Sequence, residues 1–202
     1  RGNKHMERTV LGERYIASGA TEGSFLLRGT PGNALGAYLD GASVEVFGNA
    51  QDATGDTMNA GEIIIHGNTG DAVGYAMRGG SIYVEGDAGY RAGIHMKAYG
   101  EKSPLLVIGG RAGSFLGEYQ AGGTIIVLGM GCRKGQAPVG YFTGTGMHGG
   151  KIYLRSDVPP FDLPEQVCAR AADERDMAAI QPQLDRYCRL FGKDMQRDLA
   201  GT

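Results

Sequence analysis

The stretch IIIHGNTGDAVGYAMRGGSIYVEG, residues 63–86, contains one full unit of the repeat that decides the fold. Glycine recurs at a constant interval at positions 29, 48, 67 and 86, and again at 110 and 129, with one longer interval between 86 and 110. The units that begin at positions 29, 67, 86 and 110 carry the spacing G-x-x-G-x-x-x-G, whereas the unit at Gly48 has Gln51 in the middle. A fixed period of about 19 residues is typical of repeat proteins.

A short apolar segment ends each unit. The positions two and four before the closing residue are apolar in all seven units: Phe25/Leu27, Val44/Val46, Ile63/Ile65, Ile82/Val84, Leu106/Ile108, Ile125/Val127 and Ile152/Leu154. The neighbours of the other parity include Ser43, Glu45, Glu62, His66, Ser81, Glu85, Lys151 and Arg155. Alternation with a period of two is the pattern of a β-strand with one buried face, so we expect the first set to face the core and the second to face solvent.

Successive strands must stack in parallel as the chain coils, because one repeat unit is too short for a strand-helix-strand crossover. The sequence therefore predicts an all-β fold, a parallel β-solenoid of about seven rungs. A second column, three positions after the last glycine of each motif, is expected to fill the core at the corners: Leu39, Met58, Met77, Met96, Gln120 and Met147. The glycines are expected to occupy corners where a Cβ would meet the next rung.

Composition excludes several classes of protein. Of the 202 residues, 36 are glycine and 7 are proline, yet 42% are hydrophobic, which favours a folded core over disorder. No apolar run is long enough for a membrane span, and a net charge of −2 gives no electrostatic footprint for nucleic acid. The three cysteines have no C-x-x-C spacing, which favours reduced thiols. We expect a cytoplasmic protein that binds neither membrane nor nucleic acid.

The tail after Ser156 differs in kind from the repeat. Residues 1–156 are expected to form the solenoid domain, and residues 157–202 a proline-containing linker followed by an amphipathic helical tail. Apolar residues recur at helical spacing from Met177 to Phe191, and Gly192 suits the residue that ends a helix. Pro182 is expected to divide this stretch into two short helices. The tail either caps an open end of the solenoid or binds a partner.

The side chains that could carry chemistry are few, and none has the surroundings of a catalytic or cofactor site. His66 is expected on the solvent face of its strand. His95 and His148 occupy corner positions with Tyr119 between them, but no acid stands at metal-ligand spacing. Cys132 lies beside two cations but near no histidine base. We therefore assign no catalytic, cofactor-binding or metal-binding residue.

Insertions interrupt the repeat and are the expected contact sites, since loops of solenoids map to binding faces. One lies around residues 97–104, and the largest spans the interval from Gly129 to Gly144. The larger one contains our four interface candidates, Arg133, Lys134, Tyr141 and Phe142. Aromatic anchors dominate interface energy and cations guide encounter, although Tyr141 and Phe142 could instead cover the core of the last rung.

Four runs carry a resemblance to a known family: RTVLG at 8–12, residues 29–74, GGRAGSFLGEYQAGG at 109–123 and GTGMHGGKIY at 144–153. They resemble the GXGXG domain, the carboxy-terminal domain of the glutamate synthase large subunit, in the form found as a separate polypeptide. The resemblance implies a right-handed parallel β-helix. It also implies a structural role, because the family's glutaminase nucleophile, FMN and iron-sulfur cluster are held by other domains.

We therefore expect a non-catalytic scaffold subunit of a split glutamate synthase-like complex. It would join a glutamine amidotransferase subunit to an FMN subunit in a hetero-oligomer, with FMN and an iron-sulfur cluster on the partners. Two alternatives remain open at this point. One is the related β-helix subunit of a formylmethanofuran dehydrogenase or formyltransferase/hydrolase complex, and the other is a free-standing β-helix enzyme or carbohydrate-binding protein.

Overall fold

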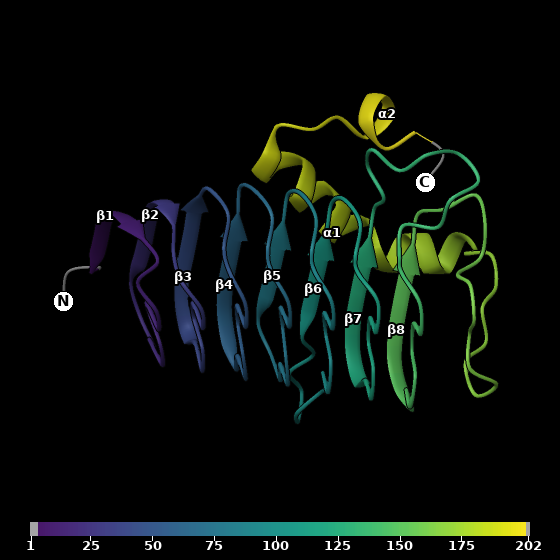
Figure 1. Ribbon diagram of the computed structural model, residues 1–202, viewed down its shortest axis with the longest axis horizontal. Helices are drawn as coiled ribbons and strands as arrows, with labels where there is room; N and C mark the ends of the chain where they lie inside the picture. The colour runs from purple at the N-terminus through teal and green to yellow at the C-terminus, as the bar shows by residue number, and fades with distance from the viewer. Residues whose placement is uncertain (1–3, 201–202) are drawn as a thin grey trace.

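The computed structural model describes residues 4–200 and consists of one parallel sheet wound into a solenoid, with a helical tail packed along it (Figure 1). The sheet has eight strands in chain order. They are β1 (His5–Leu11), β2 (Ser24–Thr30), β3 (Asp40–Phe47), β4 (Ala60–Ile65), β5 (Ser81–Val84), β6 (Leu105–Ile108), β7 (Ala121–Val127) and β8 (Gly149–Leu154). The first, β1, precedes the seven strands predicted from the repeat.

The register of the sheet confirms the predicted coil. Ile63 pairs with Ile82, one repeat unit further along the chain, and the same offset relates β1 to β2, β2 to β3, β3 to β4 and β6 to β7. The offset is longer from β5 to β6, where Ile82 pairs with Leu106, and longest from β7 to β8, where Ile125 pairs with Ile152. Each insertion thus adds residues to a turn while the strands keep their pairing.

The core of the solenoid is built from the predicted inward columns. Of the fourteen apolar positions, eleven are buried, and Phe25, Ile152 and Leu154 are partly buried at the two ends of the stack. The corner column is also buried from Leu39 to Gln120. Both predictions of core position are confirmed, except that Met147 in the last coil is only partly buried.

Two ladders of asparagine and aspartate side chains run along the corners. In each, a side-chain Oδ1 accepts the backbone N–H of the residue one coil further on. One ladder is Asn33, Asp52 and Asp71, and the other is Asn49, Asn68 and Asp87. These bonds satisfy backbone N–H groups in the turns, which have no partner in the strand ladder.

The tail forms one long helix, α1 (Glu174–Phe191), followed by the short α2 (Met195–Asp198). The prediction that Pro182 divides the tail into two helices is therefore wrong. Proline costs about 3 kcal/mol inside a helix. Pro182 itself is exposed, however, and the buried face of α1 continues past it from Ile180 to Leu184. A capping box of Asp173 and Asp176 also fixes the amino-terminal end of α1.

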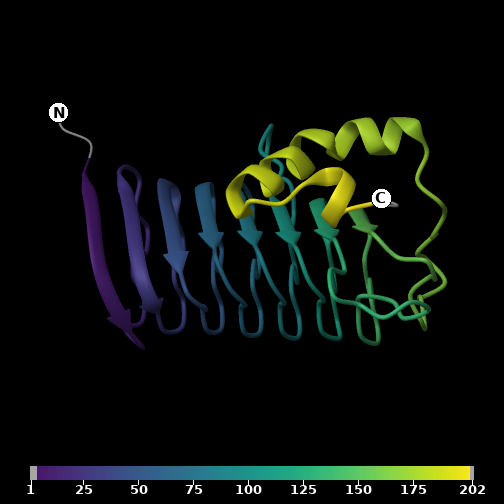
Figure 2. The same ribbon diagram turned by 90° about the horizontal axis from the view of Figure 1, so that it is seen from above.

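This helix covers the outer face of the sheet, and it runs from the β8 end of the stack back toward β4 (Figure 2). A second core lies beneath it, in which Ile180, Leu184 and Tyr187 contact outward residues of four strands: Ile64, Tyr83, Val107 and Ile126. The outward face was expected to meet solvent, and at these positions it does not. Apolar side chains occupy both faces of β4 to β7, so a cover on the second face is required.

The tail also partly covers the carboxy-terminal end of the solenoid. The segment 157–172 lies beyond β8 (Figure 1), and Val167 packs close to Gly144 in the last coil. At the amino-terminal end Ile16, Ala17 and Ala20 pack against the core, and Arg8 forms an exposed ion pair with Glu13. Within the described residues, no helix is long and apolar enough to span a membrane.

Candidate interaction surface

An exposed aromatic stack lies on the turn side of the last two coils. The ring of Phe115 stacks on that of Phe142 with centroids 5.2 Å apart. Tyr141 lies against Phe142 at 6.2 Å and against Phe161 at 6.0 Å, and the Arg91 guanidinium lies 5.2 Å from the centre of the Phe115 ring. We call these five residues the aromatic stack.

The aromatic stack occupies a turn position that is left-handed in every coil. Phe115 and Phe142 adopt left-handed conformations, with φ of 64° and 61°. Alanine holds the same left-handed position at Ala34, Ala53 and Ala72, while Tyr15 and Arg91 hold it in two other earlier coils. A left-handed conformation costs a bulky residue about 1–3 kcal/mol, so the backbone of this turn does not itself favour a ring. The phenylalanines are therefore candidates for contact with another molecule.

A second row of rings borders the same turns. His95 stacks on Tyr119 with centroids 5.2 Å apart and meets the edge of Tyr75 at 5.9 Å. His95 and Tyr119 stand four positions further along the turn than Arg91 and Phe115, and Tyr75 stands three positions after Ala72. The turn side of the solenoid thus carries an exposed apolar surface, of the kind that marks interaction sites.

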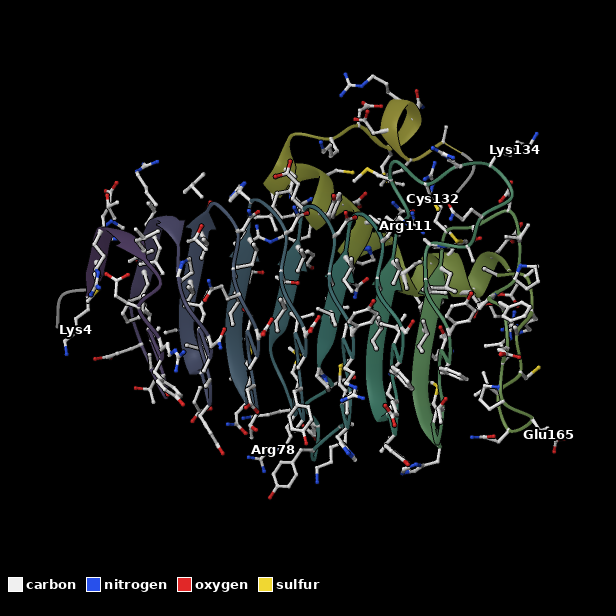
Figure 3. All side chains as sticks on the ribbon, viewed as in Figure 1. Lys4, Arg78, Arg111, Cys132, Lys134 and Glu165 are labelled. Atoms are coloured by element: carbon white, nitrogen blue, oxygen red, sulfur yellow. The ribbon has the colours of Figure 1, made fainter. Side chains whose placement is uncertain are left out.

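The four predicted interface residues fall into two separate groups. Tyr141 and Phe142 are 59% and 46% exposed, so a large part of each side chain meets solvent. Arg133 and Lys134 are exposed in the preceding loop, and Figure 3 shows Lys134 and Cys132 at the edge of the molecule where α2 lies. Neither cation takes part in an ion pair or ring contact with any residue from 4 to 200.

Only the middle of this loop lies outside the rungs of the solenoid. Cys132 Sγ lies 3.2 Å from the carbonyl oxygen of Gln136, and the Gly135 N–H donates to Asp157. Pro138, by contrast, is buried, and its carbonyl oxygen accepts the N–H of Ala112. Residues 131–136 therefore form the exposed part, while residues 137–139 belong to the next rung.

The histidines, which were expected to carry little chemistry, make ring contacts and hydrogen bonds with neighbouring residues. His66 is less exposed than predicted, because it stacks on Phe47 at 4.4 Å, meets the edge of Phe191 and bonds to Glu45 Oε1 at 2.9 Å. His148 bonds through Nδ1 to the carbonyl oxygen of Gly146. Across residues 4–200, no group of three or more His, Cys, Asp or Glu side chains is arranged to hold a metal ion.

A cleft of about 790 Å³ opens at the carboxy-terminal end of the solenoid, between β8, the segment 157–172 and the start of α1. Three cations and two acids line it: Lys151, Arg155, Arg170, Asp157 and Asp176. Arg170 donates to Asp176 at 2.6 Å, and this bond holds the pKa of the Asp176 carboxyl below its usual range. The repeat does not predict the cleft, since the segment beyond β8 follows no period.

The sequence also contains a signal for the aromatic stack. When the coils are aligned, Phe115 and Phe142 stand at the position held by alanine in three earlier coils. An aromatic side chain at a turn position outside the core columns indicates an apolar surface. Phe161 could not be found in this way, because it belongs to the aperiodic segment.

Two comparisons with known proteins give consistent results. The family model described as the GXGXG motif matches residues 5–200. The uncharacterized protein MJ1350 of Methanocaldococcus jannaschii is 46% identical over 202 residues, an alignment that covers 96% of this chain and 77% of that protein.

Proposed function

Because this chain belongs to the GXGXG family, we propose that it is a non-catalytic scaffold subunit of a split glutamate synthase-like complex. In this proposal it joins a glutamine amidotransferase subunit to an FMN-containing synthase subunit. FMN and an iron-sulfur cluster belong to the partners, and the complex aminates its substrate with ammonia released from glutamine.

The observation that carries this proposal is the exposed aromatic stack. The rings of Tyr141, Phe142 and Phe161 are exposed, and three earlier coils adopt the same turn with alanine. A regular stack of coils presents a repeating surface, so a partner that binds once needs a feature that occurs once. Large aromatic side chains and arginine are the residues that most often dominate the energy of protein interfaces.

The solenoid supplies the rigidity that a scaffold needs. Eight strands at a spacing of about 4.8 Å extend the sheet by about 34 Å, and every coil is tied to the next by strand pairing. Two enzymes bound along such a body keep a fixed separation. Ammonia transfer between active sites depends on a fixed path, which is the role we assign to this chain.

Copurification tests the proposal. We expect the tagged chain, isolated from its native cell at low salt, to retain an amidotransferase and a flavoprotein, identified by mass and by released FMN. The double change Phe115→Ala and Phe142→Ala should reduce the retained flavin at least tenfold without lowering the melting temperature. Tyr38→Ala, at an exposed ring in a left-handed turn of an early coil, is the matched control and should retain both partners.

Two outcomes would count against the scaffold role. One is the absence of both an amidotransferase and a flavoprotein from the purified assembly. The other is full retention of the partners by the double variant. The loop cations give a finer test: changing Arg133 and Lys134 to alanine should slow association at low salt and have little effect at high salt, because steering by exposed charges is screened.

A further inference from the structure

The last strand of the sheet has an open edge. In the parallel ladder the Arg155 N–H donates to the carbonyl oxygen of Val127, so residues of that parity in β8 bond back to β7. The N–H and C=O groups of the other parity, those of Ile152 and Leu154, therefore point away from β7. β8 is the final strand of the sheet, and no strand formed by residues 155–200 pairs with this edge.

The cleft gives this edge room for another strand. Its walls include β8 from Gly150 to Leu154 on one side and Val167 of the covering segment on the other. Both faces of β8 reach it, since Ile152 and Leu154 continue the inward columns while Tyr153 lies on the outward face with Met177 of α1. An extended segment in the cleft would meet apolar side chains on both of its faces.

The two ends of the sheet differ in their protection. At the amino-terminal end Arg8 pairs with Leu27 in the inward register, and its ion pair with Glu13 places charge over the end of the core. Charges at an edge discourage the addition of a further strand. At the carboxy-terminal end the same columns terminate in Ile152 and Leu154, which are apolar and only partly buried. The carboxy-terminal edge therefore lacks this barrier.

We propose that the open edge of β8 binds an extended peptide segment of a partner protein, as a ninth parallel strand within the cleft. Main-chain hydrogen bonds would hold the peptide, and alternate side chains would occupy the walls. The charges fix its chemistry further. Lys151 and Arg155 stand at the two ends of the apolar run. The Arg155 guanidinium donates to the carbonyl oxygens of Leu128 and Ala200, but neither cation forms an ion pair with residues 4–200, so acidic residues on the peptide would complement their charges.

A buried hydroxyl in the same cleft also lacks a hydrogen-bond partner. Thr143 is 3% exposed, and its Oγ1 bonds to no described residue. Buried polar atoms are rarely left unpaired, so the end of the solenoid is incomplete as it stands. A bound segment provides carbonyl and amide groups beside this coil.

A second copy of this chain suits the edge poorly. Two β8 strands paired antiparallel about Tyr153 would place Lys151 of each copy opposite Arg155 of the other, and like charges directly opposite are destabilising. Pairing β8 of one copy with β1 of another would bury the Arg8 and Glu13 charges against Leu154. A partner peptide with acidic ends avoids both costs.

The probe for the test is the capped, fluorescent peptide Glu-Ile-Ile-Val-Glu, which repeats Ile125–Val127 of β7 between two glutamates. We expect saturable binding to the full chain, measured by anisotropy, with half-saturation below about 1 mM. The matched peptide with lysine at both ends should bind at least tenfold more weakly.

The variant Leu154→Pro removes a free N–H from the edge while leaving the β7 pairing intact, since proline is tolerated at such edge positions. It should reduce probe affinity at least tenfold with an unchanged circular dichroism spectrum. A second comparison leaves the protein unaltered: two probe isomers carry N-methyl groups at alternate positions, and only the isomer whose methylated nitrogens face β8 should lose binding.

Three results would overturn the inference. They are no binding of the probe at about 1 mM, equal binding of the two N-methyl isomers, or equal binding of the acidic and basic probes. The inference concerns the end of the solenoid and not the aromatic stack. The probe experiment uses the purified chain alone, so its failure is distinguishable from failure of the scaffold proposal.

Discussion

At the scale of single residues, the glycine repeat is explained by space as well as by backbone conformation. Several motif glycines have ordinary φ values, but a Cβ on them would collide with a ladder oxygen of the preceding coil. At Gly86 that Cβ would lie 2.1 Å from the Asn68 Oδ1, and at Gly110 it would lie 2.0 Å from the Asp87 Oδ1. The ladder and the glycine spacing thus require each other.

This dependence predicts a double-mutant cycle. Gly86→Ala should lower the free energy of unfolding by about 1–3 kcal/mol, because the new methyl group displaces the Asn68 side chain. Asn68→Ala should cost about 1 kcal/mol, since the Asp87 N–H loses its acceptor. The double variant should cost less than the sum, as Asn68→Ala removes the atom that the methyl group meets. Chemical denaturation measures all three, and strictly additive costs would contradict the explanation.

At the scale of elements, α1 is fastened to the sheet by polar contacts around its apolar face. The Tyr187 hydroxyl donates to the carbonyl oxygen of Glu85 at 2.7 Å, and Arg186 forms an ion pair with Glu62. Glu85 also lies 3.7 Å from Lys193. The outward glutamates expected to meet only solvent therefore help position the tail.

Alkaline pH should release the helix. Burial, followed by the Glu62 charge, raises the pKa of Tyr83 from 10.0 to about 12, and burial also raises the pKa of Tyr187. A raised folded-state pKa means that both phenols favour their neutral form when the helix is docked. The stabilising effect of Tyr83 is complete below about pH 10 and is lost as the pH rises through about 12, and that of Tyr187 is lost as the pH rises further. Tyrosinate absorbance and helical circular dichroism should change together in this range.

The variant with Tyr83→Phe and Tyr187→Phe serves as the control for this titration. It removes both ionising groups from beneath α1, so its helix should stay docked to higher pH. Ionisation of every tyrosine near pH 10 with no change in the helical signal would contradict the prediction.

At the scale of the whole molecule, the solenoid has three surfaces that need cover, and the chain treats each differently. The outward face of β4 to β7 is covered by α1, the amino-terminal end carries an ion pair, and the carboxy-terminal end is closed loosely by the segment 157–172. The turn side of the last coils carries exposed rings. The folded state therefore depends on the tail, although the coil itself is built without it.

Undocking the tail should expose a large apolar surface. Leu184→Glu places a charge at a fully buried position between α1 and the sheet, at a cost of several kcal/mol. We expect increased binding of a hydrophobic dye and self-association on gel filtration, with the β-sheet signal retained. Ala178→Glu, on the exposed side of the same helix, is the matched control and should behave like the parent chain. Equal dye binding by both variants would show that α1 is not the essential cover.

The sequence by itself determined the coil, because each rung depends on residues that recur within one repeat unit of one another. The inward columns, the parallel stacking and the corner glycines all follow from that local period. The insertion after Gly129 also pointed to Tyr141 and Phe142 as interface candidates, with core cover as the other reading, and the structure exposes both rings. The amphipathic pattern from Met177 to Phe191 indicated helix, but the pattern carried no information about what its apolar face meets.

Tertiary structure alone decided where the aperiodic parts lie. Tyr187 and Glu85 are 102 residues apart in the chain, and no repeat relates them. Pro182 remains within one helix because packing on the sheet offsets its local cost. The aromatic stack joins Phe115 in the repeat to Phe161 beyond it through Phe142 and Tyr141. Such contacts depend on complementary surfaces brought together by folding, whereas periodicity reports only on neighbours that the coil itself places side by side.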